Sequence, residues 1–342
     1  MRNGACDAQS ELDLWTKIAA CAGWSGAFSN NLSYFTHMND REDHLFSCSE
    51  VADMAWMIQS SPLLRPAAWR GVTAVDEKWC ADQFAQALPW LVELDAHPDP
   101  LIKAMSAESS LLGKRFESLV SYWLNHSGRF ELAGERIVFA QSGRTFGEVD
   151  FVFREKGTDE WIHLEVACKY YLASSPSTTW SAWRGANSAD RLDLKVLKME
   201  DQLRLLQSAA GREWAKIGGV HASRKLAMLK GYFFVPFNQL GRHVLPKDSS
   251  PHHHAGWWMN LRDANTLTDS PGPWIILPKN RWFAPWNAHF FQTAMFTGRE
   301  LIKQLSEEFL RHKSAMIVQA DPLGGGYEIS RGMIVPDRWP GV

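Results

Sequence analysis

Near residue 129 the spacing of the apolar residues changes, and this change constrains the fold more than any other feature. Before it, residues 110–125 carry apolar side chains at helical spacing, so that they share one face. After it, three segments alternate or run apolar over lengths typical of strands, and Gly, Ser and Thr residues separate them. These segments are residues 129–140, 145–155 and 160–173. The sequence therefore predicts a helix followed by three consecutive strands.

The rest of the chain extends this pattern into an α/β fold. An amphipathic helix is expected over about residues 189–210 and a last helix over 297–315, with strands at 230–237 and 273–278 between them. This order predicts one α/β domain with a mixed central sheet over residues 106–342.

The N-terminal third reads differently from this domain. Residues 49–105 resemble short helices punctuated by Pro, and residues 1–48 have little periodicity. We therefore expect a helical N-terminal region over 49–105, preceded by a peripheral extension over 1–48.

Composition excludes several classes of protein. No apolar run approaches the roughly 18 residues that span a bilayer, so no membrane partner is expected. The five cysteines are odd in number and widely spaced, without a CxxC pair, which argues against a disulfide framework or a zinc ribbon. The first residues lack a basic start followed by an apolar stretch. These features predict a cytoplasmic protein.

Charge is distributed unevenly along the chain. Residues 1–105 hold seven Lys and Arg against 14 Asp and Glu, whereas residues 169–250 hold 13 Lys and Arg against six Asp and Glu. A polyanion such as nucleic acid would be attracted to the second region. Ordinary variation of surface charge is the alternative explanation.

Two neighbouring predicted strands carry acidic residues among apolar ones. By alternation, Glu148 and Asp150 share one face of their strand, and Glu165 shares a face with Lys169 of the next strand. Charges within a buried strand cost several kcal/mol unless they are paired or bound to metal. Carboxylates held close together suit Mg²⁺ or Mn²⁺. The alternatives are a plain ion pair between Glu165 and Lys169, and Asp150 as a hairpin cap.

The run from GKRFESLV through GEVDFVF to LEVACKYYL resembles the core of the PD-(D/E)xK nuclease superfamily. The resemblance implies a restriction-endonuclease-like core of a helix, three antiparallel strands, a helix and a strand. It also implies that Asp150 and Glu165 are metal ligands, that the backbone carbonyl of Val166 completes the metal site, and that Glu117 is the helix acid.

The sequence departs from the superfamily pattern at the lysine. That lysine lies two residues after the second acid, where this chain has Ala167, whereas Lys169 lies two residues further along on the same face. We assign the lysine role to Lys169. Some branches of the superfamily also carry a Gln on the following helix, which Gln202 matches.

A closer resemblance covers the chain from about residue 50 to the C-terminus. Segments such as VADMAWMIQSSPLL, GRTFGEVDFVF, LEVACKYYL and HHHAGWW are similar to the bacterial family known only as domain of unknown function 1853. That family has no assigned substrate. Together the two resemblances imply a Mg²⁺-dependent nuclease that hydrolyses phosphodiester bonds of nucleic acid, with DNA as the expected substrate. The alternative is a non-catalytic nucleic-acid-binding or protein-interaction module that retains the nuclease fold.

Two other sequence features are expected to be structural. Residues 252–254 form a His triplet that predicts an exposed loop, because three adjacent side chains cannot all face one site. Five Trp residues cluster late in the chain and predict core packing, since buried aromatics are the commoner case. They are Trp257, Trp258, Trp274, Trp282 and Trp286.

Overall fold

The computed structural model describes residues 45–106, 111–141, 144–270, 272–290, 293–309, 314–321 and 326–341. Most of the extension expected over 1–48 therefore lies outside the described residues. Within the described ranges, no helix is long and apolar enough to cross a membrane. The strands are β1 (Thr73–Ala74), β2 (Phe130–Gln141), β3 (Arg144–Glu155), β4 (Trp161–Ala173), β5 (Trp183–Arg184), β6 (Ala222–Pro236), β7 (His254–Asn260), β8 (Trp274–Leu277), β9 (Ala315–Ala320) and β10 (Glu328–Val335).

These strands form one mixed sheet, as the sequence predicts. Its order is β2-β3-β4-β6-β7-β10-β9-β8, with β1 beside β6 and β5 beside β4. Strands β2, β3 and β4 are antiparallel neighbours, whereas β4, β6, β7 and β10 run parallel to one another. Strands β9 and β8 close the far edge in antiparallel pairing.

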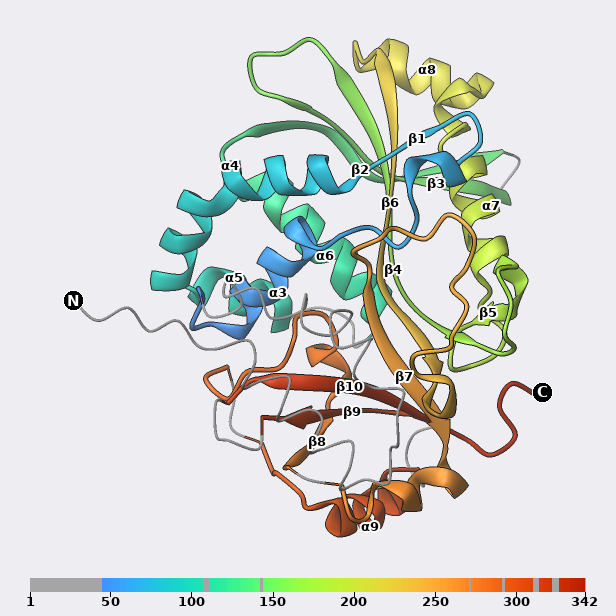
Figure 1. Ribbon diagram of the computed structural model, residues 1–342. Coiled ribbons are helices and arrows are strands. Elements are labelled where there is room, and N and C mark those ends of the chain that lie inside the picture. The colour runs from blue at the N-terminus through green and yellow to red at the C-terminus, as the bar shows by residue number, and fades with distance from the viewer. Residues whose placement is uncertain are drawn as a thin grey trace.

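The helices cover both faces of the sheet. They are α3 (Ser49–Gln59), α4 (Glu77–Ala96), α5 (Asp99–Ser106), α6 (Leu112–His126), α7 (Leu192–Gln202), α8 (Ala209–Ile217) and α9 (Gly298–Phe309). Short 3₁₀ segments lie at Pro66–Ala68, Trp180–Ala182, Leu205–Gln207, Phe237–Gln239, Leu261–Leu267 and Lys279–Arg281. Helices α3 to α6 lie on one side of β4 and β6, α7 lies on the other, and α9 lies beside β8 and β9 (Figure 1).

Strand alternation sorts the side chains between these two layers. Phe151 and Phe153 of β3 are buried in the same core cluster as Phe116 of α6. Ala167 of β4 points the other way and packs in a second cluster with residues of α7, among them Val196. The face that carries Asp150 and Glu165 is therefore the α7 face, which fixes where any site built on them must lie.

Two sequence predictions about the elements were wrong, and three strands were not predicted. The helix expected over 189–210 is two helices, because the chain turns after Gln202 and Ser208 caps a new helix by accepting the backbone N–H of Gly211. The helix expected over 297–315 ends its described part at Phe309, and a strand begins at Ala315. Strands β7, β9 and β10 were not predicted.

The His triplet was also assigned wrongly as an exposed loop. His252 is exposed, but His253 is buried and His254 begins strand β7. His254 accepts the indole N–H of Trp56 at 2.9 Å, so it belongs to the core. The late Trp residues do pack inside, as predicted: four of the five are buried and Trp258 is half-buried.

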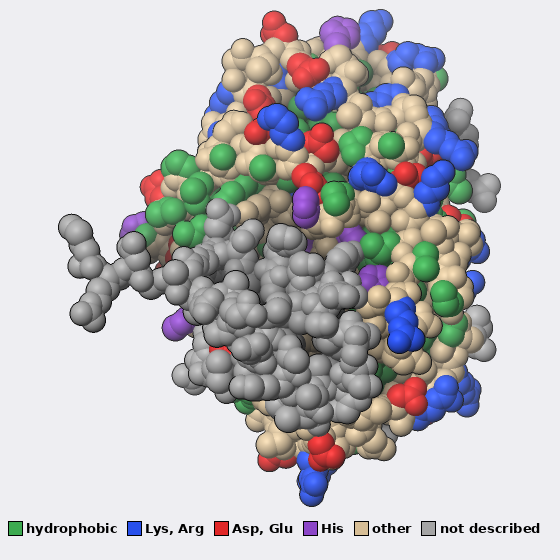
Figure 2. All heavy atoms as spheres, viewed as in Figure 1, with side chains coloured by type: hydrophobic (Ala, Val, Ile, Leu, Met, Phe, Trp, Pro, Cys, Tyr) green, Lys and Arg blue, Asp and Glu red, His purple; other side chains and the backbone are tan. Residues whose placement is uncertain are grey.

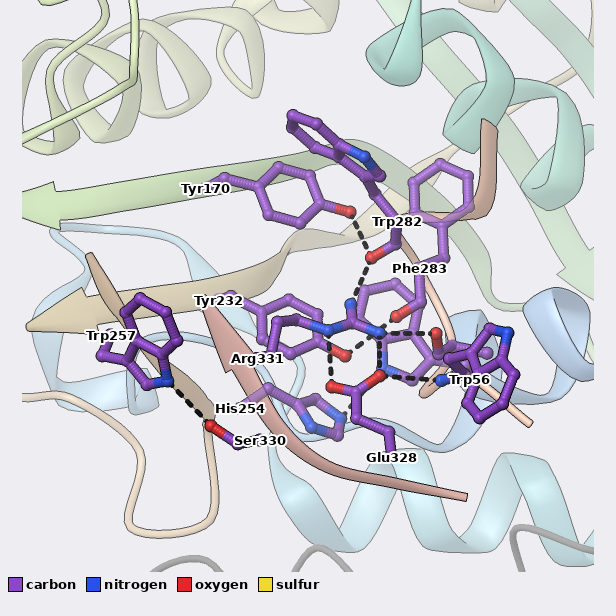
Figure 3. A network of polar contacts seen from close by, with 12 residues as sticks. Trp56, Tyr170, Tyr232, His254, Trp257, Trp282, Phe283, Glu328, Ser330 and Arg331 are labelled. Atoms are coloured by element: carbon purple, nitrogen blue, oxygen red, sulfur yellow. Dashed lines mark hydrogen bonds and ion pairs between the residues drawn. The ribbon is translucent and has the colours of Figure 1, made fainter. Parts of the chain in front are cut away.

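A buried ion pair within β10 is hydrogen-bonded to the segment before α9 (Figure 3). The Arg331 guanidinium donates to both carboxylate oxygens of Glu328, at 2.7 and 2.8 Å, and both side chains are at most 1% exposed. It also donates to the carbonyls of Trp282 and Ala284, and it lies over the Tyr232 ring. Because nearly every donor has a partner, the desolvation cost of the pair is offset by its hydrogen bonds.

Removing one member of this pair will destabilise the fold strongly. Arg331→Met leaves the Glu328 carboxylate buried without its cation, which costs about 3–5 kcal/mol of unfolding free energy. Urea denaturation measures the loss. Arg338→Met is the control, since Arg338 is exposed and is expected to change the free energy by less than about 0.5 kcal/mol. Equal effects of the two substitutions would contradict this account of the pair.

Candidate functional site

The ladder between β3 and β4 ends at a pair of acidic residues. The two strands pair at only three positions, Phe151 with Leu164, Val152 with His163, and Phe153 with Ile162. Asp150 and Glu165 are the next residue on each strand. Beyond this point β3 stays paired with β2, and β4 stays paired with β6. The sheet therefore opens between β3 and β4 where the carboxylates lie.

The two carboxylates replace the missing backbone pairing. Asp150 Oδ2 accepts the backbone N–H of Val166 at 2.9 Å, and Glu165 Oε1 accepts the backbone N–H of Asp150 at 3.2 Å. The two carboxyl groups also hydrogen-bond to each other. This exchange of side-chain and backbone bonds holds the two acids together at the opening, as the sequence predicts for side chains on one face.

His163 holds the Glu165 carboxylate in its orientation. Its ring is fully buried, and Nε2 lies 2.9 Å from Glu165 Oε1. Burial lowers the pKa of His163 to about 4, so the ring is neutral at pH 7 and can donate its Nε2 proton to Glu165. Strand alternation places His163 on the same face as Glu165, two residues before it.

Burial makes the carboxylate pair unusual. Glu165 is 1% exposed and Asp150 is half-buried. Burial raises the pKa of Asp150 to about 8, with further contributions from the charges of Glu165 and Glu117. Burial likewise raises the pKa of Glu165 to about 8, and the charge of Glu148 adds to this. The pair therefore retains a proton at neutral pH, since two charges so close in a buried site cannot both form.

This donor set suits a hard divalent cation. A divalent ion would displace the retained proton and remove the repulsion between the carboxylates. The Val166 carbonyl lies at the same opening, because the N–H and C=O of one strand residue face the same neighbouring strand. In the part of the chain that the structure describes, no group of three or more His, Cys, Asp and Glu is placed to hold a metal. Mg²⁺ needs no such group, as it commonly binds one or two carboxylates and keeps several waters.

Two of the other predicted site residues lie around this pair. Glu117 of α6 acts on Asp150 through its charge, and its carboxylate is paired with Lys114 at 2.7 Å. Gln202, the last residue of α7, donates from Nε2 to the Glu148 carbonyl at 3.0 Å. Gln202 therefore holds α7 against β3 and does not contact the carboxylates.

Lys169 is directed elsewhere. Its ammonium is paired with the Asp190 carboxylate, which also accepts the Tyr171 hydroxyl at 3.4 Å. Asp190 lies two residues before Leu192, the first residue of α7. The Lys169 ammonium therefore anchors the helix and has its charge neutralised by Asp190.

A second cation, Lys195 of α7, was not among the site residues expected from the sequence. Burial and the charge of Lys169 lower the pKa of Lys195, while the charges of Asp150 and Glu165 raise it. Lys195 thus lies close enough to both acids to interact with them. The signal in the sequence was its spacing from Gln202, since residues seven apart share a helical face.

The carboxylate pair will make stability depend on pH. The folded pair keeps its shared proton up to about pH 8, whereas in the unfolded state both groups lose their protons near 3.8 and 4.5, the ordinary pKa values of Asp and Glu. The folded protein binds more protons in this window, so its stability falls as pH rises from about 4 to about 8. Asp150→Asn keeps the acceptor for the Val166 N–H and removes one charge. It should raise the melting temperature above that of the wild type at pH 8.5 but not at pH 5, in metal-free buffer.

Asp159→Asn is the matched control, because Asp159 is fully exposed and should show no such pH-dependent gain. The opposite result would be a melting temperature of the wild type that rises, relative to that of Asp150→Asn, between pH 5 and pH 8.5. It would show that the pair is ionised in the folded state.

Comparison with known proteins identifies the chain by family. The model of the family described as Domain of unknown function (DUF1853) matches residues 52–335, which include every element from α3 to β10 except the first three residues of α3. No curated protein and no solved structure matches the chain. The match covers well over half of the sequence, so this chain belongs to the DUF1853 family.

Proposed function

We propose that this chain is a metal-dependent nuclease that hydrolyses phosphodiester bonds of nucleic acid, with DNA as the expected substrate. The observation that carries the proposal is the pair formed by Asp150 and Glu165, held together where β3 and β4 part. A purely structural ion pair would combine opposite charges, whereas this pair concentrates like charges that hold a proton.

The order of elements around the pair supports the same proposal. Helix α6 is followed by the antiparallel strands β2, β3 and β4 and, after the short β5, by α7, α8 and the strand β6, which runs parallel to β4. Apart from β5 and α8, this is the order that the resemblance to the PD-(D/E)xK superfamily implies. The first acid lies on the second strand and the second acid on the third, as in that pattern.

Asp150 and Glu165, with the Val166 carbonyl, would hold Mg²⁺ or Mn²⁺. When bound, such an ion lowers the pKa of a water and stabilises negative charge on a phosphoryl group. The protein side of the site keeps the donors fixed. Backbone N–H groups hold one oxygen of each carboxylate, and the neutral His163 ring holds Glu165 in its orientation.

The reaction is a hydrolysis at phosphorus. A water oxygen forms the new P–O bond while the bond from phosphorus to one sugar oxygen breaks. The water loses one proton to solvent and the departing sugar oxygen gains one, so one water is consumed for each bond cleaved. Glu117, whose charge acts on Asp150, can accept a hydrogen bond from the attacking water.

Exposed cations beside the site support a polyanionic substrate. The segment from the end of α7 through α8 carries exposed basic residues, and Lys and Arg side chains follow the upper and right margins of the view in Figure 2. These exposed residues are Arg204, Arg212 and Lys216. Such a surface attracts phosphates without reading sequence.

The purified protein should cleave DNA in the presence of Mg²⁺ or Mn²⁺. Asp150→Asn and Glu165→Gln each remove a metal ligand and should lower the cleavage rate by about 1000-fold, equivalent to about 4 kcal/mol of transition-state stabilisation. Gel assays on plasmid and on single-stranded DNA and RNA measure the rate and the preferred substrate.

Asp159→Asn and Glu160→Gln change exposed acids on the preceding turn and should leave the rate within about twofold, as is usual for exposed sites. An Asp150→Asn variant that cleaves at the wild-type rate would remove the pair from the mechanism.

One observation favours a second candidate, a nucleic-acid-binding module without catalysis. Lys169, assigned to the lysine role from the sequence, is paired with Asp190 and does not face the carboxylates. A binding module would retain affinity for nucleic acid but show no Mn²⁺ binding that depends on Glu165. Calorimetry with Mn²⁺ on the wild type and on Glu165→Gln separates the two candidates.

A further inference from the structure

Helix α7 is fixed to the sheet at both ends. At its start, Asp190 is paired with Lys169 of β4, and at its end Gln202 donates to the Glu148 carbonyl of β3. The helix therefore runs across the face that carries Asp150 and Glu165, from one end of the site to the other. The middle of the helix lies over the strand position between Lys169 and Glu165, which is Ala167.

The packing under the helix agrees with this placement. Ala167 is buried in one cluster with Leu192, Val196 and Met199 of α7. Ala167 occupies the place where the nuclease pattern has its lysine, and a methyl group leaves room above the strand. The helix thus covers the position from which the usual ammonium is missing.

Lys195 is the helix residue that faces the acids. Lys195, Met199 and Gln202 are spaced i, i+4 and i+7, so they lie along one face of α7. Met199 is fully buried and Gln202 reaches β3, so this face is turned toward the sheet. Lys195 lies about two turns, or about 10 Å, before Gln202. In the described part of the chain its ammonium has no hydrogen bond or ion pair within contact distance, although the charges of Asp150, Glu165, Lys169 and Lys198 act on it.

We propose that Lys195, not Lys169, supplies the cation of the proposed nuclease site, by placing its ammonium beside the carboxylate pair from the α7 side. The inference rests on the proposed function. When a phosphodiester lies at the site, the Lys195 ammonium stabilises the negative charge that grows on the phosphate oxygens as the new P–O bond forms. Lys169 acts through Asp190 as a positioning residue for α7.

The test compares Lys195→Met with Lys198→Met, which removes an exposed ammonium one turn later on the same helix. Lys195→Met should lower the DNA cleavage rate by about 100-fold or more, as expected for loss of a group that stabilises developing charge. Lys195→Arg keeps the charge and should cleave DNA at least about tenfold faster than Lys195→Met. Lys198→Met should change the cleavage rate of the wild type by less than about threefold. If Lys169→Met abolishes cleavage and Lys195→Met does not, the assignment is overturned.

A second readout does not depend on cleavage. Calorimetry with Mn²⁺ in low salt should give tighter binding to Lys195→Met than to Lys198→Met, by about threefold or more, because a closer positive charge is removed. Equal affinities for Mn²⁺ would overturn the position of Lys195 even in an active nuclease. Tighter binding without any cleavage by the wild type would overturn the nuclease activity but uphold Lys195 as the partner of the acids. A wild type that binds no Mn²⁺ would overturn both.

Discussion

The candidate site depends on an exchange of hydrogen bonds between two strands, β3 and β4, at the point where their backbone pairing ends. Where the ladder between β3 and β4 ends, Asp150 accepts a backbone N–H of β4 and Glu165 accepts one of β3. Each carboxylate thereby satisfies a backbone donor that the opening of the sheet would otherwise leave unpaired. The same bonds hold the two acids so close that they share a proton. One local arrangement thus accounts for the opening, the orientation of the acids and their affinity for protons.

The surrounding layers maintain this arrangement from both sides. The aromatic core beneath β3 and β4 excludes water from one face, which raises the cost of charge on the other. Helix α7 covers the second face and is anchored at Asp190 and Gln202. On the far half of the sheet, the buried pair of Arg331 and Glu328 ties β10 to the segment that contains Trp282 and Ala284. The proposed chemistry therefore belongs to the β2-β3-β4-β6 half, and the β7-β10-β9-β8 half supplies stability.

The sequence predicted the acidic pair because strand alternation is a strong local rule. Asp150 and Glu165 were expected on one face of neighbouring strands, and they meet there. The rule gives the face of a side chain but not the direction of its end, so it could not show that Lys169 turns toward Asp190. It also says nothing about residues on other elements, which is why Lys195 was given no role in the site. Strands β9 and β10 pair with each other across a short connection, but β10 was missed because it carries Arg331 and Gly332 within its run, and glycine is depleted in strands.

The most direct test of the central claim is the number of protons released when Mn²⁺ binds at pH 7. Calorimetry in buffers of different ionisation enthalpy gives this number for the wild type and for Glu165→Gln. If Asp150 and Glu165 share a proton that a divalent ion displaces, the wild type should release about one proton for each Mn²⁺ bound, and Glu165→Gln should bind far more weakly. Tight binding without proton release, or equal binding by the two proteins, would contradict the account.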